Sequence, residues 1–280
     1  KYNIDGYVIP KNDDYFTEYS KINRLKIISN FSGSAGIAII LKNKNYLFVD
    51  GRYTTQSQIE SGKIFKIISY DKIINCDLFK NITLGIDPRL FTYNQIRKFF
   101  LKKNRIKLIK NNLVDELHFE KIHDNSKFFS LNSHIVGESN KSKINKISNY
   151  LKKNKSDYLF ISAPENVAWI LNIRGSDGPN TPMPNSRLII SKEKELIFFS
   201  RISKTKKLIK EKILKSKEVN NINNFGKKIQ QLRGKSFILD DKSCSIYFED
   251  IIRSKFKIIK KEDPIYKLKA IKNKTEIKNM

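Results

Sequence analysis

Short apolar runs rich in β-branched residues alternate along the chain with segments whose apolar residues recur every three or four positions. In the first part of the sequence, residues 36–50 (GIAIILKNKNYLFVD) predict two strands joined by a turn at Lys42–Asn45. Single strands are predicted at 7–10 (YVIP), 82–87 (ITLGID) and 106–109 (IKLI).

Helical segments are predicted between these strands. One follows Tyr53, and the clearest is 92–104 (TYNQIRKFFLKKN), in which Thr92 and Gln95 have the spacing of a capping box. Its apolar stripe consists of Ile96, Phe99 and Phe100. Alternating strands and helices of this kind favour an α/β fold.

The second part of the chain repeats this layout. A helix at 142–154 is followed by a strand at 157–162, a helix at 164–173 that begins with Pro164, and a strand–turn–strand unit at 187–200. The helix at 142–154 places Ile144, Ile147 and Leu151 on one face. The remaining predictions are helices at 205–214, 223–232 and 247–255 and strands at 236–240 and 257–260.

We therefore predict two similar α/β domains in tandem, at residues 1–128 and 129–263, joined near His123–Asn132. Residues 264–280 are expected to begin a third region as a single basic helix. The apolar pattern of that helix is still incomplete at the last residue, so we expect the sequence to be truncated.

Composition places the chain among globular proteins. Hydrophobic residues make up 39% and aromatic residues 11%, which is too much for the disordered class. The longest apolar run, 35–41, is far shorter than a membrane-spanning helix requires. The two cysteines, Cys76 and Cys244, lie far apart, so we expect no disulfide framework and a reducing, cytoplasmic location.

A net charge of +27 would ordinarily suggest a polyanionic partner. The lysines are spread through every segment and accompany many Ile and Asn residues, a mixture that an AT-rich coding sequence produces. A basic nucleic-acid-binding module stays open as an alternative of a different class, and it would bind with steep salt dependence.

The glycine- and serine-rich stretch 31–36 (FSGSAG) could form a phosphate cradle, an oxyanion site or a turn that enters a strand. A phosphate loop needs a Lys-Ser/Thr pair and a following helix, whereas a β-branched strand follows here. We predict that Gly33 and Gly36 allow a tight entry into the hairpin.

Two polar segments contain candidate site residues. Arg52 (VDGRY, 49–53) stands where a strand gives way to a helix, and it could form a structural ion pair or face a ligand. The loop 172–186 (NIRGSDGPNTPMPNS) contains Arg174 and Asp177, which could pair with each other or present an ion to a neighbouring domain. Trp169, on the preceding helix, is expected in the core.

The three histidines show no spacing typical of a metal site or a catalytic triad. His118 and His123 are five residues apart, and the chain has no HExxH, CxxC or GxSxG motif. We expect no catalytic residue and no metal ligand in these 280 residues.

Seven ordered motifs resemble those of the three-domain, cytosolic Xaa-Pro aminopeptidases (aminopeptidase P). They are YVIPKNDDYFTEY, ISNFSGSAG, FVDGRYTTQ, LGIDPR, NLVD, PENVAWILNIRGSD and KAIKNKTEI, and they cover nearly the whole chain. The resemblance implies two ribonuclease-H-like α/β domains of the creatinase N-terminal type with mixed β-sheets. A C-terminal pita-bread catalytic domain would follow, with its first residues at 264–280.

In that family the pita-bread domain holds two divalent ions, typically manganese, and hydrolyses the bond after the N-terminal residue when proline comes second. The resemblance therefore implies that this chain is a non-catalytic portion, inactive alone, that shapes the cleft and supports assembly into a homodimer or larger oligomer. Arg52 looks like an arginine that reaches the substrate cleft, and Arg174 and Asp177 are weaker candidates for lining it.

Two features depart from the family pattern. Tyr15 stands where a histidine is common, and the helix that usually precedes the first strand is missing. Prolidases and creatinase-like amidinohydrolases share this architecture, so they remain the alternative enzymes.

Overall fold

The computed structural model describes residues 2–17, 19–74, 76–117 and 126–280, which form two compact units. Unit 1 consists of the described residues of 1–122 with Ser245–Tyr247, and unit 2 of the described residues of 123–244 and 248–280. The predicted junction begins within 118–125, which lie outside the described residues, as do His118 and His123. The domain boundaries at 128/129 and 263/264 stay predictions.

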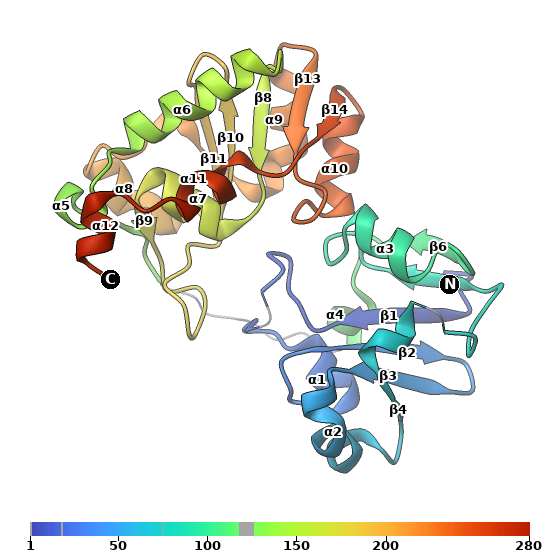
Figure 1. The fold of residues 1–280 in the computed structure, drawn as a ribbon. Helices are drawn as coiled ribbons and strands as arrows, with labels where there is room; N and C mark the ends of the chain where they lie inside the picture. The colour runs from blue at the N-terminus through green and yellow to red at the C-terminus, as the bar shows by residue number, and fades with distance from the viewer. Residues whose placement is uncertain (1, 18, 75, 118–125) are drawn as a thin grey trace. The chain divides into compact units, whose positions relative to one another are not determined.

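Unit 1 is built on a six-stranded mixed sheet in the order β4-β3-β2-β1-β5-β6 (Figure 1). β2 runs antiparallel to both β1 and β3, and the other neighbours are parallel. The strands are β1 (Gly6–Pro10), β2 (Gly36–Leu41), β3 (Asn45–Val49), β4 (Lys66–Ser69), β5 (Thr83–Ile86) and β6 (Arg105–Leu108). The helices are α1 (Arg24–Ser29), α2 (Thr54–Ser61), α3 (Tyr93–Phe99) and α4 (Leu113–Leu117).

Both faces of this sheet are buried. Successive side chains of a strand point to opposite faces, so Val8 joins a core cluster with Ile96 of α3, and Ile9 joins another with Leu25 of α1. The two clusters make unit 1 a three-layer structure with the sheet in the middle. Burial on both faces explains why β1, β2 and β3 are continuous apolar runs rather than alternating ones, whereas the edge strands β4 and β6 are partly exposed.

Unit 2 contains a second six-stranded sheet in the order β12-β11-β10-β8-β13-β14. Its strands are β8 (Tyr158–Ile161), β10 (Arg187–Ser191), β11 (Leu196–Ser200), β12 (Val219–Asn221), β13 (Ser236–Leu239) and β14 (Lys257–Lys260). A separate two-stranded sheet pairs β7 (Phe129–Ser130) with β9 (Ile173–Arg174).

The helices of the second part of the chain are mostly short. They are α5 (Ser133–Val136), α6 (Asn140–Lys153), α7 (Pro164–Leu171), α8 (Lys206–Lys210), α9 (Phe225–Gln231), α10 (Ile246–Arg253), α11 (Pro264–Ala270) and α12 (Lys274–Lys278). Short 3-10 helices lie at Gly51–Tyr53, Tyr70–Ile73, Ile202–Thr205, Ser216–Glu218 and Ile222–Asn224.

The two six-stranded sheets have the same topology. Numbered along the chain within each unit, the strands lie in the order 4-3-2-1-5-6, with the same parallel and antiparallel neighbours. This repeat confirms the predicted fold class, a tandem α/β arrangement with mixed sheets.

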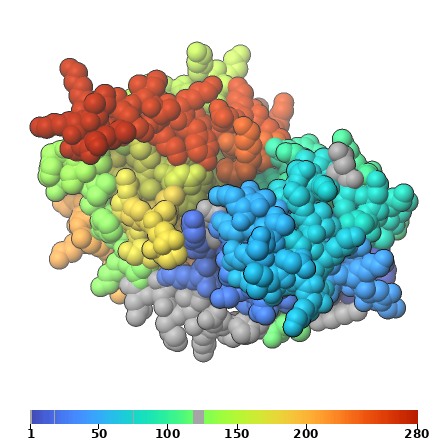
Figure 2. Space-filling model, turned by 60° about the horizontal axis from the view of Figure 1, so that its bottom comes forward, coloured from blue at the N-terminus to red at the C-terminus, as the bar shows by residue number. Residues whose placement is uncertain are grey.

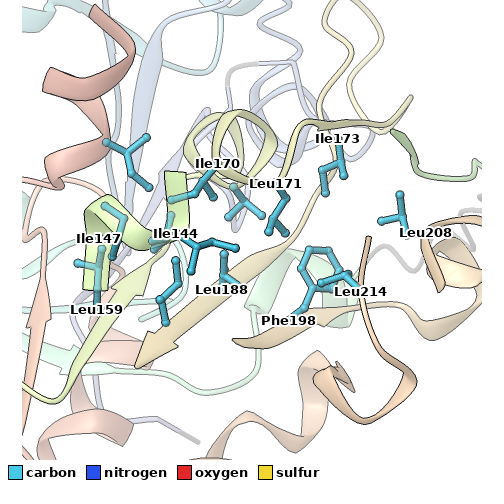
Figure 3. Close-up of a cluster of buried hydrophobic side chains, with 14 of the residues drawn as sticks. Ile144, Ile147, Leu159, Ile170, Leu171, Ile173, Leu188, Phe198, Leu208 and Leu214 are labelled. Atoms are coloured by element: carbon cyan, nitrogen blue, oxygen red, sulfur yellow. The ribbon is translucent and has the colours of Figure 1, made fainter. Parts of the chain in front are cut away.

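Unit 2 has a continuous hydrophobic core between its sheet and the helices α6 and α7 (Figure 3). Ile144 and Ile147 of α6 contribute to it, as the helical spacing predicted, together with Leu159 of β8. Trp169 is partly buried against the same cluster, in agreement with the expectation that it belongs to the core.

The single basic helix predicted for residues 264–280 is wrong. The segment forms two short helices, because α11 ends at Ala270, where Ile271 has an extended backbone, and α12 begins after a new N-cap at Asn273. Its side chain accepts a hydrogen bond from the backbone N–H of Glu276, and the Glu276 carboxylate accepts one from the backbone N–H of Asn273. Ile265 of α11 lies in the core of unit 2.

Candidate functional site

The glycine- and serine-rich stretch 31–36 is a turn into strand β2, as predicted. Its polar groups already have partners: the carboxylate of Glu60 accepts hydrogen bonds from the Ser32 backbone N–H (2.8 Å) and hydroxyl (2.7 Å). A side chain on Gly33 would lie 2.3 Å from the buried ring of Phe31. The glycine is therefore required by close packing, and a carboxylate of α2 occupies the donors that a phosphate would need.

Arg52 lies in the 3-10 helix directly after β3. Its Nε donates to Oδ1 of Asp50 at 2.8 Å, and its backbone N–H donates to the same oxygen. These hydrogen bonds lower the pKa of Asp50. The Arg52 side chain is 72% exposed, so the guanidinium group combines the structural ion pair with access to solvent.

A hollow of about 240 Å³ lies beside this ion pair in unit 1, where β1 ends and β2 begins. Asp50 lines it together with Lys11, Asn12 and the aromatic ring of Phe16. Phe16 has a φ of +60°, a backbone conformation that bulky residues rarely adopt. Asp50 thus connects Arg52 to a small depression with both polar and aromatic walls.

Asp177 has a structural position in unit 2. It is 3% exposed, and it forms an ion pair with the ammonium of Lys204. Its carboxylate also accepts hydrogen bonds from the Ser126 hydroxyl at 2.7 Å and the Asn185 backbone N–H at 2.6 Å. These contacts hold together the base of the loop 172–186, so the carboxylate is not available to a substrate.

Arg174 and Asp177 do not pair with each other. Arg174 ends the short strand β9, where its Nη1 donates to the backbone oxygen of Ile173 at 2.9 Å. The residue is half-buried, and this burial lowers the pKa of the guanidinium. The loop that follows projects from β9 before it returns to β10 (Figure 1), and its exposed tip, 179–182, belongs to the yellow surface segment of Figure 2.

Lys143 is a buried cation that the sequence analysis did not single out. It is 1% exposed, and its Nζ donates to Oδ1 of Asn172 at 2.7 Å and to the backbone oxygen of Trp169 at 2.9 Å. Burial lowers its pKa to about 8. The available signal was its spacing, because Lys143 precedes Ile147 by four positions and therefore shares its helical face.

Potential metal ligands are dispersed in the part of the chain that the structure describes. Within those residues, no three His, Cys, Asp or Glu side chains come together in a way that could hold a metal ion. His134 is exposed at the surface of α5. The same described residues include no helix with the length and apolar character needed to cross a membrane.

Comparison with known proteins shows the family to which this two-unit chain belongs. Residues 1–112 and 120–276 match two family models, each described as a creatinase/prolidase N-terminal domain. The chain belongs to the creatinase/prolidase N-terminal domain family. The two matches correspond to the two sheets with repeated topology.

Relatives of this creatinase/prolidase-type chain include peptidases from several eukaryotes. It is 30% identical over 310 residues to Xaa-Pro aminopeptidase 1 of Dictyostelium discoideum, covering 99% of this chain and 48% of the relative. It is 29% identical over 301 residues to the Xaa-Pro aminopeptidase ApepP of Drosophila melanogaster, covering 98% and 48%. The chain thus spans about half the length of these curated relatives.

A solved structure has the same fold. The X-prolyl aminopeptidase of Caenorhabditis elegans, described as a cytosolic enzyme with a di-nuclear active site, superposes with a TM-score of 0.83 at 22% identity. The match covers 98% of this chain and 48% of the other. At this identity the superposition shows the shared fold.

Proposed function

We propose that this chain is the N-terminal, non-catalytic portion of a metal-dependent Xaa-Pro aminopeptidase, which removes the N-terminal residue that precedes proline in a peptide. The observation that carries the proposal is the match to Xaa-Pro aminopeptidase 1 of Dictyostelium discoideum over 99% of this chain. In this role the two units wall the substrate cleft and support assembly into a homodimer or larger oligomer in the cytoplasm.

The proposal assigns the metal chemistry to residues outside this chain. The described residues provide no set of ligands for a metal ion, so they do not fit the di-nuclear centre described for the Caenorhabditis elegans enzyme. We propose two divalent ions, manganese in particular, in the complete protein. Residues 264–280 would lead into the domain that holds them.

Arg52 is the proposed substrate contact of unit 1. Its guanidinium group is exposed and oriented by Asp50, and a planar fork of N–H donors suits a peptide carbonyl or carboxylate. Arg174 is the corresponding candidate in unit 2. Asp177 is proposed to act indirectly, because its buried ion pair holds the loop that begins at Arg174.

The test compares the complete protein with the 280-residue chain on a proline-second tripeptide, in the presence of manganese. We expect hydrolysis by the complete protein only, and cleavage by the isolated chain would contradict the assignment. A dipeptide with proline second distinguishes a prolidase from an aminopeptidase, because a prolidase would prefer the dipeptide to the tripeptide.

Arg52→Ala in the complete protein tests the proposed contact. Loss of a charge-assisted hydrogen bond is expected to lower kcat/KM by about tenfold or more. Arg233→Gln, at an exposed arginine of unit 2, is the matched control. Unchanged kcat/KM in Arg52→Ala would leave the arginine with a structural role alone.

A further inference from the structure

The guanidinium group of Arg174 is a half-buried cation that has no carboxylate partner within the part of the chain that the structure describes. Its only side-chain hydrogen bond within the described chain goes to the backbone oxygen of Ile173, at 2.9 Å. No Asp or Glu of the described residues forms an ion pair with it. Burial lowers the pKa of the guanidinium group.

Two other cations withdrawn from water in this protein have carboxylate partners, whereas the buried Lys143 hydrogen-bonds to Asn172 and to a backbone oxygen instead. Arg24 forms a bidentate pair with Asp115, at 2.8 and 2.9 Å, and the buried Lys204 pairs with Asp177. A desolvated charge without a counter-ion carries a free-energy cost that such pairs offset. Arg174 has no such carboxylate partner among the described residues.

The surroundings of Arg174 add positive charge. Lys143 lies near enough for Arg174 to lower the pKa of its ammonium by repulsion. The hydrogen bonds of Lys143 are made to Trp169 and Asn172, and the carboxylates of Glu138 and Glu276 act on Lys143. Within the described chain, neither of these carboxylates forms a hydrogen bond or an ion pair with Arg174.

The backbone around Arg174 is well constrained. Strand β9 pairs with β7 in a register that places Arg174 opposite Phe129. Beyond it, Asp177 holds the base of the loop, and the Gly175 backbone N–H donates to the Pro182 backbone oxygen. The guanidinium fork is thus presented from an ordered support, which reduces the entropy lost when a ligand binds.

We propose that Arg174 is a carboxylate-binding residue whose partner comes from outside the described chain. A guanidinium fork matches the two oxygens of a carboxylate, and pairing would offset the cost of holding this cation half-buried. The source to which we assign the carboxylate is the free C-terminus of a short peptide. This choice of source rests on the proposed peptidase function, whereas carboxylate binding itself does not.

Binding to the 280-residue chain tests the proposal without catalysis. The probes are Ala-Pro-Ala and Ala-Ala-Ala, each as the free acid and as the C-terminal amide. Each probe is titrated into the protein, and NMR follows the Arg174 Nε–Hε resonance and the resonances of the Lys143 side chain. We expect saturable shifts with the free acids and a rise in the Lys143 pKa, with much weaker effects from the amides. Arg174→Gln should reduce affinity for the acids by about tenfold or more, Arg174→Lys by less, and Arg233→Gln should have no effect.

Thermal stability gives a second measurement, which distinguishes a ligand-binding arginine from one that stabilises the fold. Arg174→Gln removes an unpaired desolvated charge, so the thermal midpoint of the 280-residue chain should stay level or rise. A fall of several degrees would overturn the proposal. A different pair of results would assign the carboxylate to another part of the complete protein. In that case the free acids do not bind, and Arg174→Gln lowers the thermal midpoint of the complete protein but not that of the 280-residue chain. Arg174 would then still be a carboxylate-binding residue.

Two results would overturn the inference directly. One is equal binding of acids by wild type and Arg174→Gln, and the other is no acid binding together with unchanged stability of the complete protein. Equal binding of Ala-Pro-Ala and Ala-Ala-Ala would show that carboxylate binding at Arg174 does not depend on proline, and the proposed carboxylate site would stand. Failure of the proposed peptidase function is measured separately, by the absence of proline-dependent hydrolysis in the complete protein.

Discussion

The ammonium group of Lys143 lies 3.9 Å from the centre of the Trp169 ring and donates a hydrogen bond to the backbone oxygen of the same residue at 2.9 Å. It thereby satisfies a carbonyl at the C-terminal end of helix α7, where positive charge is favourable. The contact ties α6 to α7 through a cation that has been almost completely removed from water.

Lys143 should make the stability of unit 2 depend on alkaline pH. Below about pH 8 Lys143 is protonated in both the folded and the unfolded chain, so it does not make the free energy of unfolding depend on pH. Between about pH 8 and 10.5 the unfolded state holds more protons than the folded state, so the free energy of unfolding rises with pH, by up to about 3 kcal/mol. Urea denaturation across this range should show a slope that Lys143→Met removes and that the exposed control Lys153→Met retains.

Asp263 should contribute the opposite slope in acid. Burial raises its pKa from 3.8 to about 6, although its carboxylate accepts hydrogen bonds from the Ile265 N–H and the Asn166 amide. Between these values the folded state binds more protons than the unfolded state. The free energy of unfolding should therefore fall, by up to about 3 kcal/mol, as pH rises from about 4 to 6, and level off above it.

Asp263→Asn tests this effect while keeping an N-cap side chain for α11. The difference in unfolding free energy between wild type and variant should change across the window from pH 4 to 6 and remain constant above it. Glu262→Gln, at the exposed neighbouring residue, is the control. A constant difference across the window would contradict the raised pKa of Asp263.

The ion pair between Asp177 and Lys204 should be essential to the loop 172–186. Asp177→Asn leaves the Lys204 charge buried without its carboxylate, which is expected to cost about 3–5 kcal/mol of unfolding free energy. The double variant with Lys204→Met should recover most of that loss, since no charge is then left unpaired. A double-mutant cycle by urea denaturation measures the coupling, and additive losses would exclude it.

Two glycines of unit 1 provide a matched pair for the packing argument. A Cβ on Gly33 would lie 2.3 Å from the Phe31 ring, which is fully buried, whereas a Cβ on Gly51 would meet no atom within 4 Å. Gly33→Ala should lower the free energy of unfolding by about 1–3 kcal/mol. Gly51→Ala should change it by less than about 0.5 kcal/mol, and equal effects would refute steric crowding at Gly33.

Local features of the fold could be predicted because their causes lie within a few residues. The capping box of Thr92 and Gln95 is present, and helix α3 begins directly after Thr92. The turn at Lys42–Asn45 joins β2 and β3 as the apolar pattern indicated. The break within 264–280 also has a local cause, because Asn273 caps the helix that begins at Lys274.

The candidate site was less accessible to sequence analysis. Arg52 could be identified from its position after a strand, and its ion pair with Asp50 joins residues only two positions apart. Asp177, in contrast, pairs with a lysine 27 positions away, and Lys143 bonds to a side chain 29 positions away. No pattern of neighbouring residues contains this information.

The sequence alone determined most of the strands and helices, the two tandem α/β halves and the family motifs, because hydrophobic period, turn residues and caps act over short distances. It did not predict the edge strands β4 and β12, which are short and partly exposed. Only the tertiary structure decided which charges are buried and which carboxylates meet them. Burial and pairing depend on segments that the fold brings together from distant positions. This is why Arg174 is a cation with no carboxylate partner among the described residues, while Asp177 is part of the scaffold.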